Sequence, residues 1–548
     1  MAERKEPLVT EQDQDETIAA LRDPGFYPER PSVVEHVQTH ISHVFLAGSR
    51  VYKLKKAVRL SFLDFTTRDA RRVFCDEEVR LNRRLAPAVY LGVQRVTRGT
   101  RGRFELDGQG ETVDHLVCMR RLPAGRTLAA LIDAGTVGRG MLEELAELIA
   151  RFHASAPSCT VVAPLDALAA TWRQTVELAV PLVGDALAPE LHAMLRDHGP
   201  WFIERHASLL RERVAAGRVR EGHGDLHAEH VYFLDAPVPA TGLPALASGI
   251  YVVDCVEFSL PLRCSDVASE IAFTAMDLRL RGRDDLVRDF VRRYVTTARD
   301  AGIERLLPFY ACYRACVRGA VEGIKSREHE VPPADRAAAL AHSRRYFALA
   351  LQYAWQSEGP ALIACAGLSG TGKSTIAEAV AAATGFELLS SDRLRKEASP
   401  RTSPGLYGGG PYTPEARDAV YGVLIARATE ALRSGRGVVA DATFLRRAQR
   451  DRLAQAAASQ HGRHVFLECR AQEEAVRERL CSRHGSLSDA RWETYLEQRG
   501  EYEAFGADEP HVVFDSAGPF DPWTALRALW SWYRDGDAPG SHPLGQLG

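Results

Sequence analysis

The stretch Ala361-Leu-Ile-Ala-Cys-Ala-Gly-Leu-Ser-Gly-Thr-Gly-Lys-Ser-Thr375 decides the fold of the second half of this chain. Its first part is uniformly apolar, which is typical of a buried strand, and the rest matches G-x-x-x-x-G-K-[ST]. A glycine-rich turn between a strand and a helix presents backbone N–H groups to a phosphate. The residues that we predict to bind a nucleotide here are Gly367, Ser369, Gly370, Thr371, Gly372, Lys373, Ser374 and Thr375.

Four further apolar stretches predict that this turn belongs to a parallel α/β sheet. They are Phe386-Glu-Leu-Leu389, Gly437-Val-Val-Ala440, His464-Val-Phe-Leu467 and His511-Val-Val-Phe514. Ligands of such sheets bind beyond the carboxyl ends of the strands, where Asp392 and Asp441 should lie. We predict that Asp392 is the base for an acceptor hydroxyl and that Asp441, with Ser374, is a metal ligand. Capping of the following helix is the alternative role for either aspartate.

Two arginines on a later charged segment are candidates for stabilising a transferring phosphoryl group. Arg479 and Arg483 run into Gly485-Ser-Leu-Ser-Asp-Ala490, which we expect to act as a lid. A solvated arginine-rich face is the alternative. Together with Gly367–Thr375, this segment resembles the P-loop kinases of the gluconate-kinase and polynucleotide 5′-kinase type, which transfer the γ-phosphate to a hydroxyl.

A second nucleotide site is predicted in the first half of the chain. Glu221-Gly-His-Gly-Asp-Leu-His-Ala-Glu-His-Val-Tyr232 is followed by Tyr251-Val-Val-Asp-Cys-Val-Glu-Phe258. Phosphoryl transfer needs a carboxylate near the acceptor hydroxyl and oxygen ligands for a metal on the phosphates. Asp225 fits the first role, and Asp254, which we place on a strand, fits the second. A chance occurrence of His-Gly-Asp is the alternative.

These two stretches resemble the aminoglycoside-phosphotransferase and choline-kinase branch of the protein-kinase-like fold. The resemblance implies that Lys53, or Lys55 on the same strand face, binds nucleotide phosphates. It implies that Glu78, or Glu77, is the ion-pair partner of that lysine on the next helix. It also places the hinge around adenine at Met119 and the residues after it.

One position departs from that branch and leaves the metal open. His230 stands where the branch has an asparagine ligand for the second Mg²⁺, and imidazole suits softer metals than Mg²⁺. A single metal, Mn²⁺ in place of Mg²⁺, or nucleotide binding without transfer are the alternatives. The resemblance also implies that Asp266 is a buried carboxylate that braces the catalytic loop. Arg314 and Arg318 share one helix face, which points either at an acidic acceptor or into solvent and salt bridges.

The two halves in this order resemble a bacterial family of bifunctional aminoglycoside phosphotransferase/ATP-binding proteins. Val51-Tyr-Lys-Leu-Lys-Lys56 and Gly367–Thr375 carry much of the likeness, and they hold four of the seven lysines of the chain. The expected parts are a lead-in (1–30), an α+β protein-kinase-like domain (31–356, small lobe 31–122 and helical lobe 123–356), an α/β P-loop domain with a parallel sheet (357–535) and a disordered tail (536–548).

Composition narrows the class of protein further. The chain has 548 residues, 45% hydrophobic and 26% charged, as in an ordinary globular protein. Its net charge of −3 argues against a partner bound by bulk electrostatics, such as nucleic acid. No membrane-length apolar run or signal peptide is present, and the ten cysteines are scattered. We therefore expect a cytoplasmic chain with reduced thiols and no membrane partner.

Three functions remain open at this stage. The first is a phosphotransferase with two sites, each moving the γ-phosphate of ATP (or GTP) to a small-molecule hydroxyl with Mg²⁺, or Mn²⁺ at the first site. The second is a kinase for nucleic-acid 5′-hydroxyls, which the charge does not favour. The third is a P-loop kinase regulated by a first half that only binds nucleotide. The sequence leaves the acceptors and the oligomeric state undetermined.

Overall fold

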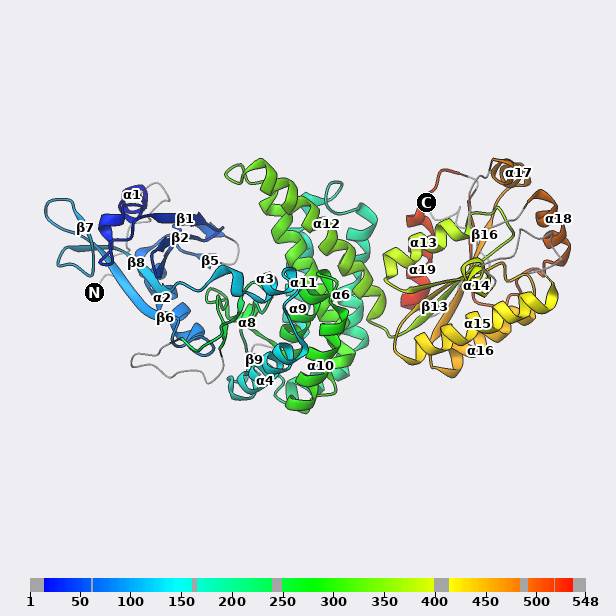
Figure 1. The fold of residues 1–548 in the computed structure, drawn as a ribbon, viewed down its shortest axis with the longest axis horizontal. Coiled ribbons are helices and arrows are strands. Elements are labelled where there is room, and N and C mark those ends of the chain that lie inside the picture. The colour runs from blue at the N-terminus through cyan, green and yellow to red at the C-terminus, as the bar shows by residue number, and fades with distance from the viewer. Residues whose placement is uncertain are drawn as a thin grey trace. The chain divides into compact units, whose positions relative to one another are not determined.

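The computed structural model describes residues 14–60, 63–159, 165–238, 249–398, 413–482, 491–516 and 518–535. Its contacts divide the chain into two compact units (Figure 1). The first unit holds Met1–Thr171 and Ile203–Arg314, and the second holds Trp172–Phe202 and Ala315–Gly548.

The first unit begins with a six-stranded antiparallel sheet in the order β1-β2-β3-β8-β6-β7. Its strands are β1 (Val34–Gln38), β2 (Ser42–Ala47), β3 (Arg50–Lys55), β6 (Tyr90–Arg98), β7 (Phe104–Leu106) and β8 (Glu111–Arg120). Tyr52 and Leu54 of β3 lie in the apolar core of the sheet. Lys53 and Lys55 point to the opposite face, because side chains alternate along a strand. Helix α2 (Arg68–Asn82) packs against β8 and β6.

The rest of the first unit is mainly helical. Apart from two strand pairs described below, its other elements are α1 (Asp15–Leu21), η2 (Pro24–Phe26), β4 (Arg59–Leu60), β5 (Leu63–Asp64), η3 (Ala124–Arg126), α3 (Leu128–Asp133), α4 (Arg139–Ser155), α7 (Ala207–Ala215), α8 (Leu260–Arg263), α9 (Val267–Leu280) and α10 (Asp284–Ala298). Helices α5 (Leu165–Leu178), α6 (Pro189–Arg205) and α11 (Ile303–Lys325) contribute residues to both units. Helix α9 is buried on all sides from Val267 to Leu278. It is therefore the central support of the helical part.

Two short antiparallel strand pairs carry the predicted loop of the first unit. Strand β9 (Val219–Glu221) pairs with β12 (Cys264–Asp266), and β10 (Val231–Phe233) pairs with β11 (Ile250–Val252). The loop 222–230 joins β9 to β10. Asp254 follows β11 and does not lie on it, which corrects our placement of this residue on a strand.

The second unit contains a five-stranded parallel sheet in the order β14-β15-β13-β16-β17. Its strands are β13 (Ala361–Ala366), β14 (Glu387–Ser390), β15 (Val438–Asp441), β16 (Arg463–Arg470) and β17 (His511–Asp515). All five predicted strands are confirmed to within a few residues. The glycine-rich turn follows the central strand, whose residues are all buried.

Helices cover both faces of this sheet (Figure 1). Helix α13 (Lys373–Thr384) packs with α19 (Pro522–Asp535) on one face. Helices α15 (Pro414–Arg433) and α16 (Arg447–Ser459) pack on the other, where Leu424 and Leu453 join the apolar core. The other elements of this unit are η4 (Val180–Leu182), α12 (Pro333–Gln356), α14 (Ser391–Ala398), α17 (Glu473–Cys481) and α18 (Trp492–Glu501).

The predicted long helix before residue 357 is present as α12, and it groups with the second unit. The Gln352 amide donates to Ala382 O of α13 at 3.0 Å, and the Gln356 amide donates to Thr384 O at 3.3 Å. The predicted domain limits stay a prediction, and the tail 536–548 lies outside the described residues.

Cys159 and Cys264 form a disulfide, so the expectation of fully reduced thiols is wrong at this pair. The remaining cysteines are free, and all of them except Cys481 are buried. Among the helices that the structure describes, none is both long enough and apolar enough to span a bilayer.

Candidate functional site

Lys53 links the sheet of the first unit to the segment that holds Asp254. Its Nζ lies 3.0 Å from Glu78 Oε1 on α2 and 2.6 Å from Asp254 Oδ1. Burial acts to raise the pKa of the Glu78 carboxyl, but Lys53 and Lys55 outweigh it and hold that pKa below its ordinary value. Burial also acts to raise the pKa of the Asp254 carboxyl, but Lys53 outweighs it, so this pKa is lowered as well. All three groups are therefore charged at neutral pH.

Lys55 supports this arrangement from deeper in the fold. Its Nζ lies 2.8 Å from Glu78 Oε2 and also contacts Glu257 Oε1, and its side chain is fully buried. Glu77, the alternative partner in our prediction, is instead bound by Arg80 and Arg263. Lys53 is thus the lysine in contact with Asp254, while Lys55 holds Glu78 in place.

The loop that carries Asp225 is fixed through its backbone. Gly224 N donates to Glu270 Oε1, and Gly224 O accepts from Arg314 Nη1 at 2.9 Å. Gly224 has φ of +85°, and a Cβ there would lie 3.0 Å from Val256 Cγ2, so the loop requires glycine at this position. Asp225 remains about one-third exposed at the end of this braced turn.

Helix α9 supplies a row of polar groups that hold the same loop. Thr274 donates to Leu226 O at 2.8 Å, and Asp277 Oδ2 accepts from Ala228 N at 2.9 Å. Together with Glu270 these residues have the spacing i, i+4, i+7, which places them on one helix face. The sequence reasoning missed this row, although polar residues at that spacing in an otherwise apolar helix were a visible signal.

The brace that we predicted at Asp266 is wrong. Its carboxylate caps α9 through Ala268 N and pairs with Arg213, which also binds Asp300.

The two arginines on α11 do not form a face toward an acceptor. Arg314 is buried and contacts the Asp225 loop, and Arg318 pairs with Glu322.

Histidines surround the two aspartates of the first site. His230 Nδ1 lies 3.0 Å from Asp225 O, and His230 Nε2 lies 3.5 Å from Asp254 Oδ2. His227 Nε2 lies 3.5 Å from Asp225 Oδ2. Ligand atoms of Asp225, His227 and His230 lie within 4.8 Å of one another, which is close enough to hold a metal ion. This mixed oxygen and nitrogen set suits a borderline divalent metal better than Mg²⁺.

The glycine-rich turn of the second unit has the backbone that a phosphate-binding loop requires. Gly370 has φ of +85°, and a Cβ there would lie 2.8 Å from Val476 Cγ1. Helix α13 begins at Lys373, directly after the turn, so its first N–H groups point toward the loop. Ser369 N donates to Gln498 Oε1 of α18 at 2.9 Å, a contact that sequence reasoning did not find.

Asp441 fits a hard cation at the end of β15. Its Oδ2 accepts from Ser390 Oγ at 3.1 Å, while its buried Oδ1 has no hydrogen-bond partner among the described residues. Burial raises the pKa of this carboxyl, and Lys373 and the Ser374 hydroxyl favour its charged form. A buried carboxylate oxygen beside a serine hydroxyl is the donor set that Mg²⁺ prefers.

The other predicted residues have mixed placements. Asp392 lies in the first turn of α14, with its Oδ1 3.1 Å from Arg395. Arg479 donates to Ser516 Oγ at 3.0 Å, and Ser516 donates to Thr371 O at 2.7 Å, so Arg479 lies against the glycine-rich turn. Met119 lies on β8 opposite Val51. Arg483 and the predicted lid Gly485–Ala490 lie outside the described residues.

Comparison with known proteins places the chain in a family. Residues 362–504 match the AAA_33 model of the AAA domain. Uncharacterized protein Rv2004c of Mycobacterium tuberculosis (strain ATCC 25618 / H37Rv) is 31% identical over 460 residues, which cover 83% of this chain and 87% of that protein. The chain belongs to the family of this mycobacterial protein.

Two solved structures match parts of this chain. A sugar kinase from Janibacter sp. HTCC2649 is 25% identical, with a TM-score of 0.27, over 33% of this chain and 99% of its own. A choline/ethanolamine kinase family protein from Mesorhizobium loti is 14% identical, with a TM-score of 0.34, over 61% of this chain and 99% of its own. Both TM-scores are low, so the fold is assigned from the sheets and ion pairs described above. The α+β kinase-like unit and the parallel P-loop domain confirm the predicted fold class, and together they support a phosphotransferase.

Proposed function

We propose that the chain is an ATP-dependent phosphotransferase with two nucleotide sites, each transferring the γ-phosphate to a hydroxyl of a small molecule. The observation that carries the two-site proposal is Lys53 held between Glu78 and Asp254, beside the Asp225 loop. The second unit pairs a lysine with a carboxylate in a similar way, because Lys373 favours the charged form of Asp441.

In the first site, each charged group has a defined task. Lys53 binds the α- and β-phosphates and is kept in place by Glu78. Asp225, partly exposed on a rigid loop, accepts the proton of the acceptor hydroxyl as it attacks the γ-phosphate. Asp254 and His230 would hold the divalent metal, for which Mn²⁺ is the better match. Such a metal, when bound, neutralises charge on the phosphates.

In the second site, the backbone of the glycine-rich turn and the start of α13 bind the β-phosphate. Lys373 reaches the β- and γ-phosphates, and Ser374 and Asp441 would hold Mg²⁺. Asp392 accepts the proton of the acceptor hydroxyl, and Arg479, already against the turn, stabilises the transferring group. GTP in place of ATP is compatible with all of these contacts.

The proposal is tested by following label from γ-labelled ATP into a metabolite extract with wild type, Asp225→Ala and Lys373→Ala. Each product should fall by about 10²–10⁴ in rate in one variant and stay unchanged in the other. Glu144→Ala, on the exposed side of α4, is the control and should retain both products.

Other outcomes separate the alternatives. Label only in an added 5′-hydroxyl oligonucleotide, lost in Lys373→Ala, would favour a nucleic-acid kinase. Products lost only in Lys373→Ala would leave the first unit a nucleotide sensor. A product that survives Lys373→Ala and disappears in Asp225→Ala rules out that sensor role. Labelled products unaffected by both variants would refute the proposal.

A further inference from the structure

The disulfide between Cys159 and Cys264 spans the strand that leads into the Asp225 loop. Cys159 N donates to Val219 O of β9 at 3.1 Å, so the segment before residue 160 runs along one edge of this strand. Cys264 lies opposite Glu221 in the β9–β12 pair, along the other edge. The two sulfurs join above β9, where both cysteines pack in one apolar cluster with Val219. The bond therefore ties together the two neighbours of β9.

These neighbours hold the strand at the point where the loop begins. Glu221 N donates to Pro157 O at 2.9 Å, and Gly222 N donates to Arg263 O at 2.8 Å. Both acceptors lie within two residues of a bonded cysteine. A crosslink at this position limits the freedom of the backbone that positions Asp225, three residues after Gly222.

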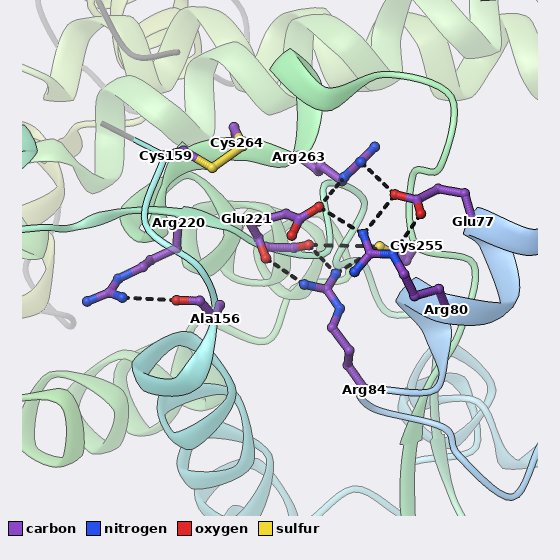
Figure 2. The surroundings of a disulfide bond; sticks show 11 residues. Glu77, Arg80, Arg84, Ala156, Cys159, Arg220, Glu221, Cys255, Arg263 and Cys264 are labelled. Atoms are coloured by element: carbon purple, nitrogen blue, oxygen red, sulfur yellow. Dashed lines mark hydrogen bonds and ion pairs between the residues drawn. A yellow bond between two sulfur atoms is a disulfide. The ribbon is translucent and has the colours of Figure 1, made fainter. Parts of the chain in front are cut away.

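Arg263, the residue before Cys264, connects the crosslink to acidic residues on other elements; Figure 2 shows it between Glu221 and Glu77. The buried Arg263 side chain donates to Glu221 Oε1 at 3.0 Å and to Glu77 Oε1 at 2.8 Å. It also donates to Glu257 O at 3.0 Å. Glu77 adjoins Glu78 on α2, and Glu257 contacts Lys55. A shift of Arg263 would therefore be passed to Glu78 and Glu257. These are the acidic residues that contact Lys53 and Lys55 of β3.

We propose that the Cys159–Cys264 pair is a thiol–disulfide exchange site through which a dithiol reductant lowers nucleotide binding at the first site. One thiolate of the dithiol attacks a sulfur of the pair and forms a mixed disulfide, which releases the first cysteine as a thiol. The second thiol of the dithiol then attacks the mixed disulfide and releases the other cysteine. The S–S bond of the protein gains two electrons and two protons and becomes two thiols. The dithiol becomes a disulfide, and a disulfide oxidant reverses the exchange.

A cavity whose wall includes Cys264 is the route that we assign to a small dithiol. Its volume is about 90 Å³, and its wall includes Cys264, Ser265 and Leu210. Its lining does not include Lys53, Asp225 or Asp254, so a reductant can enter without competing with nucleotide. This geometry separates the redox site from the site that it controls.

The first experiment asks whether the bond exists and exchanges. Peptide mapping of the full-length protein under non-reducing conditions should recover Cys159 and Cys264 in one linked species. Incubation with dithiothreitol should convert both to free thiols, and oxidised dithiothreitol should restore the link. Two free thiols in the air-oxidised protein, or a bond that dithiothreitol leaves intact in the native state, would overturn the proposal.

The second experiment measures the consequence, which rests on the proposed first nucleotide site. Binding of a fluorescent ATP analogue is measured in Lys373→Ala protein, so that only the first site responds. Reduction should weaken binding about 5- to 10-fold, the lower part of the usual range for coupled sites. Cys159→Ser should bind as weakly in either redox state. Cys481→Ser, which removes the exposed free thiol, should keep the full redox response.

A third readout distinguishes failure of the switch from failure of the nucleotide site. Hydrogen exchange of the amides from 219 to 228 should become faster on reduction in the absence of nucleotide. Faster hydrogen exchange without any nucleotide binding would refute both the proposed first site and the control of its binding. Only the thiol–disulfide exchange at Cys159 and Cys264 would then stand. Equal binding and equal exchange in both redox states would refute the switch and leave the proposed function standing.

Discussion

At the scale of single residues, the contact between His230 and Asp254 underlies the metal choice that we propose for the first site. The carbonyl of Asp225 can only accept a hydrogen bond, so His230 Nδ1 carries the proton at their 3.0 Å contact. The lone pair on Nε2 then faces Asp254 Oδ2 at 3.5 Å. A bound cation would stabilise these two acceptor atoms, His230 Nε2 and Asp254 Oδ2. A metal-binding histidine usually donates its other ring N–H to a carbonyl or carboxylate, as His230 Nδ1 does here.

His230→Asn should therefore change the metal preference of the first site. Replacing a nitrogen ligand with an oxygen ligand should weaken Mn²⁺ binding relative to Mg²⁺ by about tenfold or more. The measurement is Mn²⁺ titration by electron paramagnetic resonance, with Mg²⁺ competition, in Lys373→Ala protein with a non-hydrolysable nucleotide. His192→Asn, in the other unit, is the control. An unchanged ratio of the two affinities would show that His230 does not bind the metal.

At the scale of elements, α9 does most to shape the first site. Its carboxylate Glu270 receives Gly224 N and lies 2.8 Å from His153 Nε2. Burial acts to raise the pKa of Glu270, but His153 and the other partners outweigh it and lower that pKa to about 2. The helix thus holds the Asp225 loop through a charge that is present across the neutral range.

Glu270→Gln should lower stability in a pH-dependent way. Because the pKa is lower in the folded chain than in the unfolded chain, the charge stabilises the fold above about pH 4.5 and this contribution is lost as pH falls toward 2. The variant should lose about 2–3 kcal/mol at pH 7 and clearly less at pH 3. Thermal unfolding at pH 7, 4 and 3 measures the difference in stability between wild type and Glu270→Gln, with Glu144→Gln as the control. A difference that is constant with pH would contradict this account.

At the scale of the whole molecule, the chain carries two unrelated folds, an α+β kinase-like fold and a parallel-sheet P-loop fold, and each is proposed to hold one nucleotide. Their lysines lie on different elements, Lys53 on β3 and Lys373 at the start of α13. Lys53 contacts Glu78 and Asp254 of its own unit, and Lys373 directly follows the glycine-rich turn of the other. Replacing one lysine therefore tests one site.

Nucleotide stoichiometry should reflect this arrangement. Equilibrium dialysis with a labelled non-hydrolysable ATP analogue should give about two nucleotides per wild-type chain and about one for either Lys53→Ala or Lys373→Ala, because each variant removes one phosphate contact. The double variant should bind none at the same concentration. One nucleotide per wild-type chain, lost in Lys373→Ala, would show that only the P-loop site is real.

The sequence by itself determined the phosphate-binding turn of the second unit, because the parts of this turn are contiguous. A buried strand, a glycine-rich turn and a helix follow one another within Ala361–Thr384, so local rules were enough to predict them. The five strands were readable for the same reason, since each is a short apolar run. In the first unit, the motif chemistry suggested Asp225 and Asp254 as candidates, and a family likeness added Lys53.

Only the tertiary structure decided which groups support those candidates. The polar spacing on α9 signals a face with a role, but only the fold shows that Glu270 binds the Asp225 loop while Asp266 binds Arg213. The partners Cys159 and Cys264 are 105 residues apart. Pairings of this kind depend on how buried helices and strands pack, and packing is a property of distant residues brought together.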